Sequence, residues 1–183
     1  MRRAGRSSRW HYLAVRLPAP LPHLILDATS NNRLGSDLPT GVDRAQRLSL
    51  EGGFDRWFHL YRPVTYRSDA LYLLTPDVMA ALIDTASDFN IEIVDDTLVF
   101  FTSSTADFGT PEPWLAIHAI LADSASRIAA SARRYRDERV PGQEIPPPVS
   151  FLHVALRRAR DLRVCRADVH HRRLVGPGSA PNP

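Results

Sequence analysis

Acidic side chains crowd one stretch in the middle of the chain, and carboxylates at close spacing can bind a cation or perform acid–base chemistry. The stretch contains Asp84, Asp88, Glu92, Asp95 and Asp96. A calcium loop of the EF-hand kind needs oxygen ligands at alternate positions and glycine at the sixth, but the third residue from Asp84 is Ala86 and the sixth is Phe89. We therefore interpret the stretch as a helix end and a solvated turn. The alternative is a carboxylate- or metal-dependent hydrolase or transferase that uses Asp88, Glu92, Asp95 and Asp96.

The stretch SLEGGFDRWFHLYRP, residues 49–63, also concentrates aromatic and charged side chains. From Leu48 to Leu60 the even positions are mostly apolar, and after a glycine pair Phe54 and Phe58 share a face in either a helical turn or a second strand. Asp55 and His59 have no serine or cysteine nucleophile at a catalytic spacing. The pattern predicts that the two phenylalanines pack in the core and that His59 lies at the surface.

The C-terminal part holds the remaining candidates for chemistry. Cys165 precedes His170 and His171 in the segment CRADVHH, yet a structural zinc site needs four ligands in close pairs and the fourth is missing. We therefore expect no metal and no cofactor. Residues 151–173 form the only basic segment with enough apolar residues to become ordered on a partner. Its candidate anion-binding residues are Arg157, Arg158, Arg160 and Arg163.

Charge is segregated along the chain, although the net charge is only +3. Residues 1–16 carry five arginines and no acid, residues 17–126 carry six arginines and fifteen acids, and residues 127–183 carry twelve arginines and five acids. Basic ends around an acidic centre predict either weak contact with an anionic membrane surface or nucleic acid, or contact with the centre itself. Sequence-independent binding of nucleic acid also needs exposed aromatic residues among the arginines, and the basic segments lack them.

The single cysteine excludes an internal disulfide and favours a reducing compartment. The N-terminus lacks the apolar stretch of a secretory signal, and no run of about 18 apolar residues could span a membrane. We expect a cytoplasmic protein, with peripheral attachment to a membrane as the alternative.

Residue periodicity divides the chain into a basic N-terminal segment (1–9), an α+β domain (10–140) and a Pro/Arg-rich flexible tail (141–183). Within the domain we expect an antiparallel sheet with two helices packed on it, followed by the basic, disordered C-terminal tail. Alternation predicts strands over 10–17 and 23–28, because the prolines between them should end the first strand.

Two helices and a hairpin complete the expected domain. Thr75 as a cap and Pro76 in the first turn predict a helix over 76–87. A run without glycine or proline predicts a long helix over 114–139. Between them, two β-rich runs separated by Asp95-Asp96 predict a hairpin.

Five phrases spread over about residues 10–140 are characteristic when taken together and in order. They are LPAPLPHLILDATSNN, LSLEGGFDRWFHLY, DALYLLTPDVMAALID, FNIEIVDDTLVFFTSS and RRYRDERV. In these phrases the chain resembles a group of uncharacterised actinobacterial proteins with a membrane-anchored domain of unknown function. The resemblance implies that relatives carry transmembrane helices and more globular sequence upstream of HYLAVRLP, and it assigns no activity. This chain differs from that pattern at its N-terminus and after about Gly142.

We expect a non-catalytic interaction module derived from a membrane-associated protein, since the G-x-S-x-G, P-loop and Rossmann motifs are all missing from the sequence. Its expected ligand is a protein partner of unknown identity. If upstream strands of the relatives pair beside RWHYLAVRL, this strand presents an exposed edge, which predicts self-association.

Overall fold

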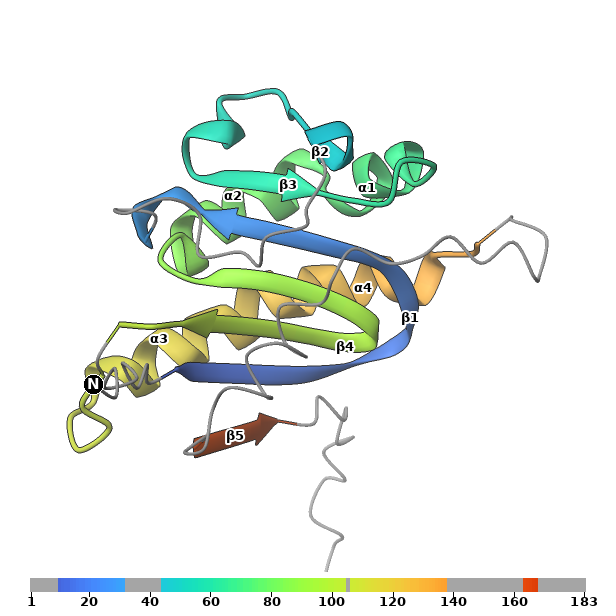
Figure 1. Cartoon of the computed structure of the whole chain (residues 1–183). Coiled ribbons are helices and arrows are strands. Elements are labelled where there is room, and N and C mark those ends of the chain that lie inside the picture. The colour runs from blue at the N-terminus through green and yellow to red at the C-terminus, as the bar shows by residue number, and fades with distance from the viewer. Residues whose placement is uncertain (1–9, 32–43, 105, 138–162, 168–183) are drawn as a thin grey trace, which may run out of the picture.

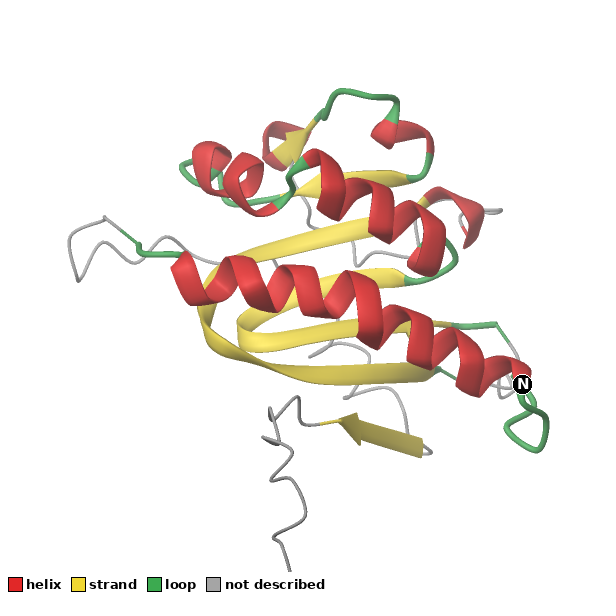
Figure 2. Cartoon of the chain, turned by 180° about the vertical axis from the view of Figure 1, so that it is seen from behind, coloured by secondary structure: helices red, strands yellow, loops and turns green. Residues whose placement is uncertain are grey.

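The computed structural model describes residues 10–31, 44–104, 106–137 and 163–167. An antiparallel sheet carries helices on one face, which confirms the predicted α+β class (Figures 1 and 2). The strands are β1 (His11–Ala28), β2 (Arg47–Leu48), β3 (Phe58–Tyr61), β4 (Asn90–Thr102) and β5 (Arg163–Ala167). The helices are α1 (Arg67–Leu73), α2 (Pro76–Ala86), α3 (Glu112–Ile120) and α4 (Ser126–Arg134), and a π-helical turn, Leu121–Ala125, joins α3 to α4.

The two long strands, β1 and β4, bend together. β4 turns at Asp95, whose φ of 52° lies in the left-handed region, and its two halves run side by side between the two halves of β1 (Figures 1 and 2). The antiparallel register shifts between the pairs Arg16–Thr97 and Leu24–Ile93, where β1 uses more residues than β4. β1 needs the extra residues because it follows the outer path around the bend.

This bend corrects the prediction of two separate strands over 10–17 and 23–28. The sequence predicts that Pro18, Pro20 and Pro22 end a strand, because proline cannot donate to a ladder. The structure instead places them in the outer bend of a single strand, β1, where they have no paired residue in β4. The hairpin predicted about Asp95-Asp96 is found within β4, which turns at Asp95 so that its two halves run side by side.

The helices cover one face of the sheet in Figure 2. The helix predicted over 76–87 is α2, although the Thr75 hydroxyl bonds to the Asp77 carboxylate and does not cap a backbone N–H. The helix predicted over 114–139 is α3, the π-helical turn and α4, which end at Arg134 because Tyr135 is extended. The short helix α1 was not predicted.

The core between the helices and the sheet contains the phenylalanines of the dense aromatic stretch. Phe54 and Phe58 are fully buried, and their ring centroids lie 5.2 Å apart, so the packing prediction is confirmed. Gly52 and Gly53 have φ of 72° and 74°, a conformation that favours glycine, and they form the turn between β2 and β3. His59 on β3 is partly exposed.

The opposite face of the sheet holds a smaller apolar cluster. Val99 and Phe101 are buried there, and Trp10, Tyr12 and Ala14 pack against them. This face also carries the polar side chains described below.

Little of the predicted flexible tail can be compared with the structure. β5 is the part of residues 141–183 that the structure describes, and it pairs in parallel with β1 from His11–Arg163 to Val15–Ala167. The edge of β1 that was expected to be exposed therefore carries β5, and self-association through it stays a prediction. The other candidate anion-binding residues, Arg157, Arg158 and Arg160, lie outside the described residues, as do residues 1–9.

Candidate functional site

The four acids of the alternative catalytic site lie in different environments. Asp88 follows α2 and is exposed, Asp95 is exposed at the bend of β4, and Asp96 forms an ion pair with Arg16. Glu92 is fully buried, and because Ile91 and Ile93 face the helices, it lies on the opposite face of the sheet. No group of three His, Cys, Asp or Glu side chains able to hold a metal occurs among the described residues.

Glu92 belongs instead to a set of polar side chains on the sheet face away from the helices. By strand alternation and register this polar row consists of His23, Asp27, His59, Tyr61, Asn90 and Glu92. His23 Nε2 lies 2.8 Å from Glu92 Oε1, and Asn90 Oδ1 accepts a hydrogen bond of 2.8 Å from the Ala28 N–H. The row therefore holds strands β1 and β4 in register through side-chain contacts.

The polar row is poorly placed for catalysis. Asp27, Asn90 and Glu92 have no exposed surface, so a substrate does not reach them in this conformation. Burial and the nearby Asp27 carboxylate raise the pKa of Tyr61, while Arg47 acts in the opposite direction, and the phenol stays protonated at neutral pH. These features fit a structural polar network within the sheet.

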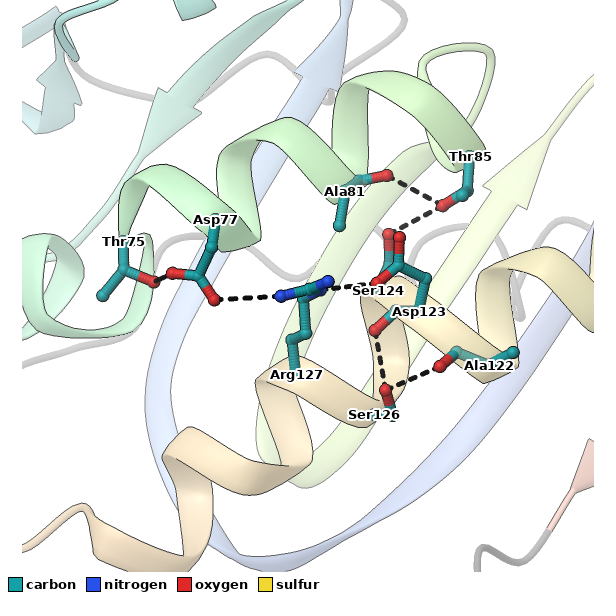
Figure 3. A network of polar contacts seen from close by, with 9 residues as sticks. All are labelled: Thr75, Asp77, Ala81, Thr85, Ala122, Asp123, Ser124, Ser126 and Arg127. Atoms are coloured by element: carbon teal, nitrogen blue, oxygen red, sulfur yellow. Dashed lines mark hydrogen bonds and ion pairs between the residues drawn. The ribbon is translucent and has the colours of Figure 1, made fainter.

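A second polar network joins α2 to the π-helical turn (Figure 3). The Arg127 guanidinium reaches Asp77 on α2, with Nη1 3.2 Å from Oδ2, and also contacts Asp123. Beneath it, Thr85 Oγ1 and the buried Ser124 Oγ lie 2.7 Å apart. This turn belongs to a class that is often found at functional sites. Its polar groups bind one another across the two helices, which is a packing role.

The strongest surface feature lies where α3 begins. Trp114 and Leu115 are 50% and 67% exposed, which is unusual for large apolar side chains. Phe108 packs edge-on against Trp114 with ring centroids 5.5 Å apart, and the centroid of the His11 ring lies 5.3 Å from that of Phe108. We use the name α3 surface for residues of α3 and of the loop before it, namely Phe108, Pro111, Trp114, Leu115 and His118.

The loop before α3 is held in place by its own hydrogen bonds. The Trp114 indole N–H donates to the Phe108 carbonyl at 3.0 Å, and the Thr110 hydroxyl donates to the Asp107 carbonyl at 3.0 Å. The Gly109 N–H donates to the Asp107 carboxylate, and a Cβ at Gly109 would lie only 3.1 Å from that carboxylate oxygen. A larger residue at position 109 would therefore disturb the loop, and the exposed tryptophan is fixed before any partner binds.

Charge around the α3 surface is acidic. Asp107 and Glu112 are exposed beside it, and the sequence has no arginine between Arg67 and Arg127. The Thr110 side chain and, after it, the Glu112 backbone lower the pKa of the Glu112 carboxyl, so the acid is charged at neutral pH. These two acids favour basic groups on a partner of this surface.

The sequence signal for this surface is the composition of α3. The run EPWLAIHAI is apolar on all sides, so a helix that packs one face on the core must expose the other apolar residues. The run predicts a helix, but its periodicity alone does not indicate which apolar face stays exposed.

No protein-family model, curated protein or solved structure matches this chain. Among the described residues, no helix is long and apolar enough to cross a membrane. The fold and the surface define an α+β domain with a fixed aromatic contact surface, and the function has to be inferred from that geometry.

Proposed function

We propose that the protein is a non-catalytic interaction module that binds a protein partner through the α3 surface. The observation that carries this proposal is the pair Trp114 and Leu115, which expose large apolar area on a loop and helix already fixed by hydrogen bonds. Aromatic residues in fixed positions are typical anchors of protein interfaces, because little conformational entropy is lost when they bind.

The partner is an apolar segment with basic flanking residues. The acids Asp107 and Glu112 next to the α3 surface favour cations on the partner and disfavour an anionic membrane. We also propose that the protein derives from a membrane-associated one, on the basis of the sequence resemblance. A cytoplasmic location is proposed from the single cysteine.

Site-specific photo-crosslinking in the cells that produce the protein tests this function. A photoreactive phenylalanine analogue at position 115 is expected to capture one protein species. The same analogue at position 71 is the matched control, since Leu71 is 48% exposed but lies on α1. Equal capture from both positions, or capture of lipid or of a second copy of this chain at position 115, would contradict the proposal.

One observation favours the alternative function, a carboxylate- or metal-dependent hydrolase or transferase. Glu92 orients the His23 imidazole at 2.8 Å, and such a pair can act as a general base where a substrate reaches it. Thermal unfolding with stoichiometric Mg²⁺, Mn²⁺ or Zn²⁺ distinguishes the two functions. We expect no change, whereas a rise of several degrees would favour the enzyme.

A further inference from the structure

Arg62 is a shielded cation just after the last residue of β3. The residue is only 7% exposed, and its backbone N–H donates to the Gln46 carbonyl at 2.9 Å, which fixes its position. Beside it, Val64 and Thr65 form an exposed turn, and Arg67 is exposed at the start of α1. Arg62 is therefore buried next to an exposed turn and a second, exposed arginine.

Within the described residues, one nitrogen of the Arg62 guanidinium forms hydrogen bonds. Nη1 donates to the carbonyls of Pro63, at 2.9 Å, and Val64. Nε is enclosed and has no partner, and Nη2 forms no hydrogen bond with the described residues. Nε and Nη2 form the side of the guanidinium that binds two oxygens of a carboxylate or phosphate at once.

The charge of Arg62 is also uncompensated within the part of the chain that the structure describes. No carboxylate there forms an ion pair with it. Burial lowers the pKa of Arg62, and the positive charge of Arg67 lowers it further. An arginine stays charged at neutral pH even so, and a shielded cation without a counter-charge is costly.

We propose that Arg62 and Arg67 form a binding site for a phosphate group. Nε and Nη2, which have no hydrogen-bond partner among the described residues, supply the bidentate contact, and the second arginine favours the doubly charged phosphate over a singly charged carboxylate. The phosphate is carried either by a small soluble molecule or by a lipid headgroup. This site is separate from the α3 surface and does not depend on the proposed function.

Nuclear magnetic resonance of the arginine Nε–Hε groups in the full chain tests the site. Inorganic phosphate is titrated while chloride keeps the ionic strength constant, so that general screening does not change. We expect the Arg62 signal to shift and saturate. In a second arm, phosphatidylcholine vesicles with and without phosphatidic acid replace the free ion, and a change only with phosphatidic acid assigns the site to a lipid headgroup.

Variants check that the guanidinium fork is responsible. Arg62→Lys keeps the charge but loses the fork and is expected to weaken phosphate binding about tenfold or more. Arg67→Gln, at an exposed position, is expected to weaken it several-fold, and Arg134→Gln, at the exposed end of α4, is the matched control without effect. The proposal is overturned if the Arg62 signal is unchanged in both arms, or if wild type, Arg67→Gln and Arg134→Gln bind alike.

Discussion

His23 Nε2 lies 2.8 Å from Glu92 Oε1, and the Glu92 side chain has no exposed surface. The contact joins β1 to β4 within the sheet. His23→Ala removes a hydrogen bond from a buried carboxylate, so we expect the free energy of unfolding to fall by about 2–4 kcal/mol. Urea denaturation of the wild type and the variant measures this change in the free energy of unfolding. His118→Ala, at an exposed histidine of α3, is the control and should change stability by less than about 0.5 kcal/mol.

Phe58 is fully buried and stacks on Phe54. Phe58→Ala leaves a cavity between the sheet and the helices, and we expect a loss of about 3–5 kcal/mol in the free energy of unfolding. Leu115→Ala removes an apolar side chain of the exposed α3 surface and should cost less than about 0.5 kcal/mol. Similar losses for the two variants would mean that the core assignment is wrong.

The ionisation of Asp77 makes the polar contacts between α2 and Arg127 depend on pH. The Thr75 hydroxyl, and after it Arg127, lower the pKa of Asp77 below its ordinary value of 3.8. A carboxyl whose pKa is lower in the folded than in the unfolded protein stabilises the fold at pH values above its unfolded-state pKa. This stabilisation is lost as the pH falls through the folded-state pKa. A carboxyl titration by nuclear magnetic resonance should show the pKa rising in Thr75→Val and, by less, in Arg127→Gln. An ordinary pKa in the wild-type protein would contradict this interpretation.

Local sequence patterns were sufficient for some elements. The α2 helix has its start marked by Thr75 and Pro76, and the aromatic stretch has an apolar face that predicted the burial of Phe54 and Phe58. These signals lie within a few residues of one another, and local backbone preferences decide them.

Other features depend on contacts between distant segments. The prolines of β1 predict a strand end locally, but the bend of β4 gives them an outer path on which no ladder hydrogen bond is needed. The polar row could not be predicted, because the register of three strands places His23, Asp27 and Glu92 on one face. The lack of a hydrogen-bond partner for Arg62 Nε likewise depends on the turn after β3.

The central claim is that Trp114 anchors a protein partner. The measurement is the dissociation constant of the partner captured at position 115, determined by calorimetry for the wild type, Trp114→Ala and Trp57→Ala. Trp57 is the matched control, because it is 44% exposed, close to the 50% of Trp114, but precedes β3. We expect Trp114→Ala to weaken binding by about 30-fold, as removal of an interface anchor does, and Trp57→Ala to leave it unchanged. Equal affinity of all three folded proteins would contradict the account.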